Sequence, residues 1–149
     1  MGLLCYNRRM TAGKKVENAH DFKVVRPGKG LGMGLVTLKS FKKGDKIIEY
    51  IGIKKTNTEV ENDETKYLFE IDDKYTIDGS PRWNIARYIN HSCAPNAEAD
   101  IIDSRIWIVA VKNIDAGSEL TYDYGKEYFD EFIRPAGCKC VKCSKKSEK

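Results

Sequence analysis

The chain has no long hydrophobic run. No stretch of its 149 residues approaches the roughly 20 apolar residues that a bilayer-spanning helix needs, so we expect no transmembrane helix and no membrane partner. The first residues also lack the basic segment and the long apolar segment of a secretory signal. With 41% hydrophobic and 32% charged residues, the composition is that of a soluble globular protein long enough for one hydrophobic core.

Helical patterns are scarce as well. Two short helices are expected, one running from Pro81, capped by Ser80, towards Tyr88 and one over residues 126–133. Short stretches rich in β-branched or aromatic residues, separated by turn signals, predict strands over residues 35–38, 46–51, 66–71, 74–77 and 105–111. The sequence therefore predicts a mostly β domain with short helices.

Charge of either sign is present, but its excess is small. The net charge of +4 comes largely from a lysine-rich C-terminal tail. No recognisable reader motif accompanies it, so direct nucleic-acid binding is not indicated. A local acidic strip is more informative and comprises Glu59, Glu61, Asp63, Glu64, Glu70, Asp72 and Asp73. Such a strip suits a basic peptide ligand, and a solvated loop explains it equally well.

Glycine is concentrated just before the first predicted strand. Gly32 and Gly34 flank Met33, and without a Cβ on either glycine the main chain can approach a zwitterionic ligand closely. A single Gly-x-Gly is most often a turn. It is not a dinucleotide fingerprint here, because no long helix follows it and strands do not alternate with helices.

Two polar stretches in the second half of the chain carry side chains suited to a binding site. The first runs from Arg87 through Asn90 and His91 to Cys93, and Asn90 offers both a donor and an acceptor. A histidine standing alone would suit a structural role. The second stretch, residues 119–125, contains Tyr122 and Tyr124, whose rings would share one face of an extended segment.

Three cysteines lie close together near the C-terminus. Cys138, Cys140 and Cys143 form C-x-C-x2-C and offer three thiolates from one turn-rich segment. A structural zinc ion takes four tetrahedral ligands. Redox cysteines or a disulfide are the alternative, and zinc is preferred for an intracellular chain.

Taken together, Asn90-His91-Ser92-Cys93, the Tyr122-Asp123-Tyr124-Gly125 run and the cysteine cluster resemble the SET domain of protein lysine methyltransferases. The resemblance covers about residues 22–143. It implies the SET fold, small curved sheets around a knot-like crossing in which a C-terminal segment passes under a loop. It also divides the chain into an N-terminal arm (1–21), a SET domain (22–134) and a post-SET zinc segment with a basic tail (135–149).

The resemblance also assigns roles within the site. It implies that S-adenosylmethionine binds Gly32, Met33, Gly34, Arg87, Asn90 and His91, with His91 acting more through its backbone than through its imidazole. Tyr124 matches the catalytic tyrosine, and Tyr122 and Tyr67 would line a channel for the substrate lysine. For Tyr67, packing on a sheet face is nearly as good an interpretation. Tyr128 and Phe129 could close the channel, cover the adenine or belong to the core.

For the metal, the resemblance implies that Cys93 joins Cys138, Cys140 and Cys143 around a structural zinc. The zinc would hold the tail over the channel and the cofactor, as the post-SET motif does. Cys5 is then the odd cysteine.

The implied activity is methyl transfer from S-adenosylmethionine to a lysine of a basic protein, with a histone tail as the leading substrate. A hydroxyl at Tyr122 would crowd a second methyl, which favours mono- or dimethylation. Alternatives are a non-histone substrate, or a catalytically silent SET module that binds a basic partner. We expect a nuclear or chromatin-associated protein if the source is eukaryotic or the protein acts in a eukaryotic host, and a cytoplasmic one otherwise.

Overall fold

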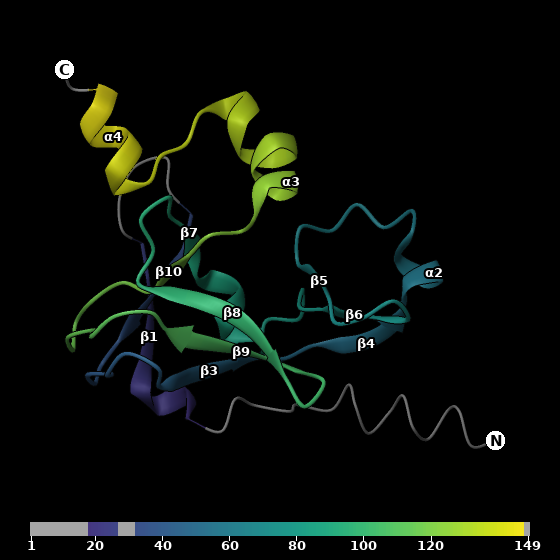
Figure 1. Cartoon of the computed structure of the whole chain (residues 1–149), viewed down its shortest axis with the longest axis horizontal. Coiled ribbons are helices and arrows are strands. Elements are labelled where there is room, and N and C mark those ends of the chain that lie inside the picture. Colours follow the sequence, from purple (N-terminus) through teal and green to yellow (C-terminus); the bar gives the residue numbers. More distant parts are fainter. Residues whose placement is uncertain (1–17, 27–31, 148–149) are drawn as a thin grey trace.

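The computed structural model describes residues 18–26 and 32–147, and in this part of the chain four small β-sheets are joined by short helices (Figure 1). Among these residues no helix has the length and apolar character needed to cross a membrane. The prediction of a mostly β fold with short helices is confirmed.

Two antiparallel sheets and one antiparallel pair form the body of the domain. The pair joins β1 (Phe22–Val25), preceded by the single turn η1 (Ala19–Asp21), to β2 (Gly34–Thr37). The first sheet has the order β3-β9-β8, with bounds Lys46–Tyr50, Arg105–Ala110 and Ala97–Ile102. The second has the order β4-β6-β5, with bounds Ile53–Thr56, Tyr75–Asp78 and Leu68–Glu70.

The fourth sheet is a parallel pair of two-residue strands, β7 (Asn90–His91) and β10 (Thr121–Tyr122). It joins the two polar stretches of the sequence. The remaining helical turns are α2 (Asn57–Val60), η2 (Ile85–Tyr88), α3 (Lys126–Tyr128), η3 (Phe129–Ile133), η4 (Arg134–Ala136) and α4 (Val141–Ser147). The expected helix over 126–133 is confirmed, whereas the one expected from Pro81 contains only the 3-10 turn η2.

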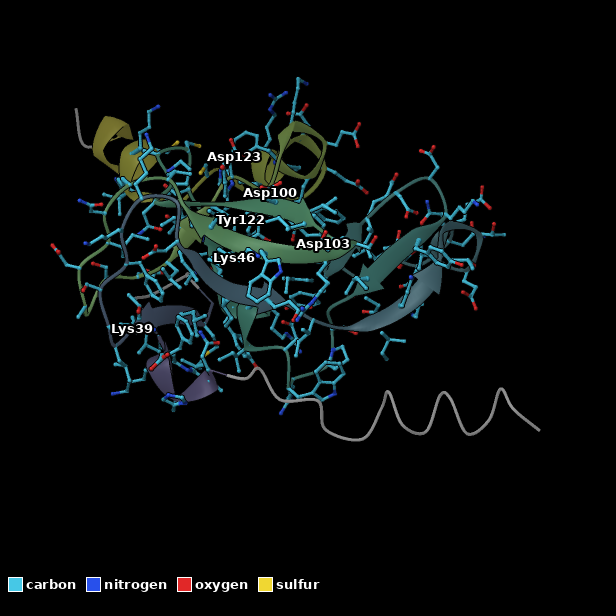
Figure 2. All side chains as sticks on the ribbon, turned by 60° about the horizontal axis from the view of Figure 1, so that its bottom comes forward. Lys39, Lys46, Asp100, Asp103, Tyr122 and Asp123 are labelled. Atoms are coloured by element: carbon cyan, nitrogen blue, oxygen red, sulfur yellow. The ribbon has the colours of Figure 1, made fainter. Side chains whose placement is uncertain are left out.

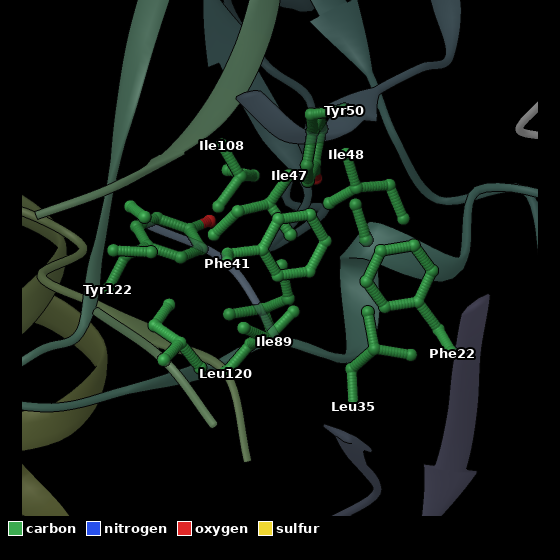
Figure 3. Packing of buried hydrophobic residues seen from close by; sticks show 14 of the residues in the cluster. Phe22, Leu35, Phe41, Ile47, Ile48, Tyr50, Ile89, Ile108, Leu120 and Tyr122 are labelled. Carbon is green, nitrogen blue, oxygen red and sulfur yellow. The ribbon is translucent and has the colours of Figure 1, made fainter. Parts of the chain in front are cut away.

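The core lies between the sheets and is mainly aliphatic (Figure 3). Alternation along β9 turns Ile106, Ile108 and Ala110 inward. On β3 the register shifts between Lys46 and Ile48, and consecutive residues Ile47 and Ile48 are both fully buried. Each such side chain stabilises the fold by roughly 1.5–3 kcal/mol relative to exposure.

The second sheet is joined to the core by a buried polar residue. The Asn84 side chain donates to the Gly79 carbonyl at 3.0 Å and accepts from the Ile51 N–H at 3.3 Å. A Cβ on Gly79 would overlap the Tyr50 ring, so glycine at this position lets Tyr50 pack against the backbone. The Tyr50 hydroxyl then donates to the Tyr67 carbonyl at 2.9 Å. These hydrogen bonds fix the position of Tyr50 and of the backbone at Tyr67, between the two sheets.

Part of the acidic strip has a local structural role. Glu59 forms a capping box with Thr56 at the start of α2, and the hydrogen bonds from Thr56 lower the pKa of its carboxyl. Asp72 accepts the backbone N–H groups of Lys74 and Tyr75, which lower its pKa as well. Asp63 pairs with Lys55 at 3.3 Å. These three carboxylates therefore stabilise their own loop.

Asp78 supplies a test of how the second sheet is held together. Its buried carboxylate contacts Lys55 Nζ at 2.8 Å and accepts the Ser80 N–H at 3.0 Å. Burial raises the pKa of Asp78, but the bonds from Lys55 and Ser80 outweigh it and hold the pKa below its ordinary value. We expect Asp78→Asn to lower the free energy of unfolding by about 1–2 kcal/mol at pH 7, measured by urea denaturation.

Because the folded-state pKa of Asp78 is depressed, the unfolded chain takes up the proton first as the pH falls. The stabilisation is therefore present above the unfolded pKa of about 3.9 and is lost as the pH falls further. The gap between wild type and Asp78→Asn should close in acid. Asp100→Asn, at an exposed position on β8 (Figure 2), is the matched control and should change stability by less than about 0.5 kcal/mol. A gap that is absent at pH 7, or that persists unchanged in acid, would contradict this account.

Candidate active site

The four cysteines of the expected zinc site are brought together. The sulfur atoms of Cys93, Cys138, Cys140 and Cys143 all lie within 4.8 Å of one another. Cys93 Sγ is 3.9 Å from that of Cys138 and 3.7 Å from that of Cys143. Four ligands placed tetrahedrally at about 2.3 Å from a zinc ion would be about 3.8 Å apart. The separations therefore fit a tetrahedral zinc site, and the thiols are free of disulfide bonds.

The surroundings of the cysteines already favour a thiolate at one position. Burial raises the pKa of Cys140, but hydrogen bonds from the backbone N–H groups of Cys93 and Cys143 bring it down to about 6. Burial, followed by the neighbouring thiols, raises the pKa of Cys93 to about 12. A thiolate at Cys140 beside three further cysteine sulfurs is suited to a divalent cation, which displaces thiol protons on binding.

Beside the cysteines lies a cavity of about 400 Å³. Five of the six expected cofactor residues line it: Gly32, Met33, Arg87, Asn90 and His91. Tyr88 and the residues that follow α3, among them Phe132 and the segment 136–140, complete its wall. Gly34 is not part of the lining. A Cβ on Gly34 would come within 2.7 Å of Glu119 Oε1, and the contact of Gly34 with the cofactor stays a prediction.

Glu119 is a site residue that the sequence analysis gave no role. Asn90 Nδ2 donates to Glu119 Oε1 at 3.0 Å and to the Met33 carbonyl at 3.1 Å. Both amide hydrogens are thereby used, and Asn90 Oδ1 has no hydrogen-bond partner in the described part of the chain. The corner therefore presents acceptors, which suits the ammonium group of a ligand.

A second, smaller cavity of about 70 Å³ adjoins the first. Five tyrosines line it: Tyr50, Tyr67, Tyr122, Tyr124 and Tyr128. Tyr67, Tyr124, Tyr128, Lys66 and Arg87 line both cavities, so the two share a wall. Tyr122 and Tyr67, expected to line the channel, and Tyr124, expected to be the catalytic tyrosine, are thus brought together. Nothing in the sequence indicates that Tyr50 belongs to the channel, because it lies in a stretch whose residues indicate a core strand.

The hydroxyl groups of this tyrosine channel are not equivalent. Tyr124 donates to the carbonyl of Ile89, and Tyr50 donates to that of Tyr67. The Tyr122 hydroxyl has no partner among the described residues, although its ring packs 4.8 Å from that of Tyr124. Burial raises the pKa of all three phenols well above the ordinary value. They are therefore neutral near pH 7 and act as hydrogen-bonding groups instead of bases.

The two aromatic residues whose roles were left open in the sequence have separate positions. Tyr128 lines both cavities and packs edge-on against Tyr124 at 4.9 Å between ring centroids. Phe129 lines neither cavity and instead packs 5.4 Å from the ring of His91. Burial lowers the pKa of His91, although Asp123 at 3.8 Å opposes the shift.

Four small β-sheets, a cavity of about 400 Å³ and an adjoining tyrosine channel thus characterise the domain. Residues 32–125 match the family model of the SET domain, so the chain belongs to the SET-domain family.

Known relatives agree with this assignment. The chain is 37% identical to "Histone-lysine N-methyltransferase trithorax" of Drosophila virilis, over 76% of this chain and 3% of that protein. It is 40% identical to "Histone-lysine N-methyltransferase, H3 lysine-4 specific" of Chaetomium globosum, over 61% of this chain and 10% of that protein. It therefore spans only a small part of the length of these relatives.

A solved structure shares the fold. It is a humanized mutant of the Chaetomium thermophilum Polycomb Repressive Complex 2 bound to the inhibitor GSK126. The match has a TM-score of 0.61 and 29% identity, and covers 68% of this chain and 14% of that chain.

The cysteine geometry leads to a direct test. Purified protein should contain about one zinc ion per chain by plasma mass spectrometry, because four thiolates satisfy one tetrahedral ion. Cys140→Ser should lose most of the metal and lower the midpoint of thermal unfolding. Cys5→Ser is the matched control and should keep the metal. Metal-free protein whose unfolding is unaffected by a chelator, or a disulfide among these cysteines, would contradict the assignment.

Proposed function

We propose that this domain transfers a methyl group from S-adenosylmethionine to the side-chain amine of a lysine in a protein. The observation that carries the proposal is the shared wall of the two cavities, which contains Tyr124. A ligand in the larger cavity and a lysine in the tyrosine channel would meet at this tyrosine. In-line displacement needs such alignment and no covalent enzyme intermediate.

The larger cavity suits the cofactor through its own groups. Asn90 Oδ1 and the Met33 carbonyl offer acceptors at one corner, and Arg87, Tyr88 and Tyr128 contribute polar and aromatic wall. S-adenosylmethionine, when bound, supplies a methyl group on a positively charged sulfur. The chain's contribution is to orient that ligand and to exclude water from the junction of the two cavities.

The tyrosine channel also suits the substrate amine. A free lysine has a pKa of about 10.4, so its amine is mostly protonated at neutral pH. Desolvation among aromatic rings and the neighbouring guanidinium of Arg87 both disfavour the ammonium form. Tyr124 lines both cavities, and its hydroxyl would orient the amine and the transferring methyl. No side chain has to act as a dedicated base.

We further propose that the four cysteines hold a structural zinc ion. Cys138 and Cys140 line the larger cavity as well as belonging to the cluster, and residues 136–140 form a continuous part of the cavity wall. An ion bound by these cysteines and Cys93 would hold that wall in position. Its contribution would be structural, because all four thiolates are used as ligands.

A basic protein tail is the proposed substrate, with a histone as the leading candidate. The named relatives are histone-lysine methyltransferases. In addition, four exposed acidic residues make no polar side-chain contact among the described residues: Glu61, Glu64, Glu70 and Asp73. Of these, Glu70 directly follows Leu68 and Phe69, which line the tyrosine channel, so its negative charge is available to a basic substrate there. Action on histones would make this a nuclear or chromatin-associated activity.

The first test is mass spectrometry of core histones and of other small basic proteins incubated with the domain and S-adenosylmethionine. We expect a gain of methyl mass on lysine, and Tyr124→Phe should reduce the rate by roughly 100-fold through lost alignment. Tyr75→Phe, which alters an exposed tyrosine on β6, is the matched control and should keep the rate. No transfer despite cofactor binding would mean that the substrate is a different protein or that a partner is missing, and absence of cofactor binding as well would favour the silent SET module.

The number of methyl groups added is a separate prediction. We propose that the unpaired Tyr122 hydroxyl holds the amine or a water molecule inside the channel, so wild type stops at one or two methyl groups. Tyr122→Phe removes that hydroxyl and should extend the product to a higher methylation state on the same lysine, as read by mass spectrometry. Identical product distributions for the two proteins would refute this role of Tyr122.

A further inference from the structure

His91 has a buried side chain that the proposed chemistry does not use. Its backbone lies on β7, opposite Tyr122 of β10. Its imidazole is only 6% exposed and packs between the rings of Tyr124 and Phe129, with both centroids 5.4 Å away. A buried polar ring in this position needs partners for both of its nitrogens.

Those partners are the backbone of Tyr124 and the sulfur of Cys93. The Tyr124 N–H donates to His91 Nδ1 at 3.1 Å, and His91 Nε2 lies 3.3 Å from Cys93 Sγ. A backbone N–H can only donate, so Nδ1 is the acceptor and carries no proton. In the neutral ring the proton is then on Nε2, where it points at the sulfur.

We propose that His91 is a positioning residue whose imidazole connects the cysteine cluster to the backbone of Tyr124. The inference rests on the proposed function for the meaning of Tyr124, but the connection itself is independent of activity. A metal-bound thiolate is a fixed and strong acceptor, so it orients the Nε2–H and, through the rigid ring, the Nδ1 atom. Nδ1 in turn fixes the main chain at Tyr124. Metal bound by the cysteines thereby orders the tyrosine at the junction of the cavities.

The backbone at Tyr124 needs such an anchor, because it lies beyond the end of β10. Thr121 and Tyr122 are held by β7, but the strand ends at Tyr122. Gly125 follows with a φ of 93°, in the left-handed region. The Tyr124 hydroxyl bonds to the Ile89 carbonyl, so the bond from its N–H to His91 is the second anchor of the residue. The imidazole therefore anchors Tyr124 through its main chain.

Three variants test the two imidazole contacts separately, one at Nδ1 with Tyr124 and one at Nε2 with Cys93. His91→Phe keeps a ring and removes both hydrogen bonds. His91→Asn keeps an acceptor near the position of Nδ1 and lacks a group that reaches the sulfur. His91→Gln can carry an amide N–H to the position of Nε2 and lacks the acceptor for Tyr124. Zinc release to a chromogenic chelator and hydrogen exchange of the Tyr124 amide report on the two ends separately.

In wild type, removal of zinc should speed exchange of the Tyr124 amide. In zinc-loaded His91→Phe that exchange should already be faster by roughly 10-fold, the loss of one hydrogen bond, and zinc should bind roughly 10- to 100-fold more weakly. His91→Asn should show weakened zinc retention with a protected Tyr124 amide, and His91→Gln the reverse. Where transfer is measured, kcat should fall in His91→Phe while KM for S-adenosylmethionine stays nearly constant, because the backbone of His91 is unchanged.

Two results would overturn the proposal. One is a zinc-loaded His91→Phe protein with wild-type zinc release and wild-type exchange at Tyr124, which would make the imidazole a space-filling ring. The other is wild-type exchange at Tyr124 that does not respond to zinc removal. If His91→Phe fails to fold, equal zinc release and equal exchange in His91→Asn and His91→Gln would also overturn it. None of these measurements requires methyl transfer, so they remain decisive even if the proposed function fails.

Discussion

The parallel pairing of β7 with β10 is the constraint on which the site depends. It is only two residues long on each side, yet it brings Asn90 and His91 against Thr121 and Tyr122. Strands this short have little stability of their own. Ile89 and Leu120, the residues just before the two strands, are fully buried and hold the pair to the core.

Hydrogen bonds from a single asparagine side chain support this strand pairing. Asn96 donates to the Glu119 carbonyl at 2.9 Å and accepts the Thr121 N–H at 2.9 Å, which fixes the entry into β10. One segment thereby carries both Glu119, which orients Asn90 at the larger cavity, and Tyr122 in the tyrosine channel. Ligand binding and substrate alignment are therefore set by the same short stretch, and a shift of one residue in its register would move both.

The sequence predicted the parts of this arrangement that local patterns encode. Its β-branched and aromatic residues predicted the strand over 105–111, which contains β9, and the motifs that resemble the SET domain identified Asn90, Tyr122, Tyr124 and the cysteines. It could not predict contacts made by single residues across long stretches of chain. Asn84 bonds to the backbone at Ile51 and Gly79, and this use of its side chain accompanies a turn where a helix from Pro81 was expected. Gly34 was expected to approach the ligand, whereas its missing Cβ makes room for Glu119.

The tail poses a different physical problem. Beyond Tyr122, the only hydrophobic residue that is buried in the described chain is Cys140, and Val141 at the start of α4 is 69% exposed. Figure 1 shows α3 and α4 on the same side of the domain as β7 and β10. Apolar burial therefore offers this segment little stability, although it forms one wall of the larger cavity. Four converging thiols supply the alternative, because binding free energy at a metal site becomes folding free energy for the segment that carries the ligands. In the proposed zinc site, three of the ligands would come from the tail and one from the residue two positions after β7. Such a site would therefore join the least supported wall of the cavity to the strand pair that organises the rest.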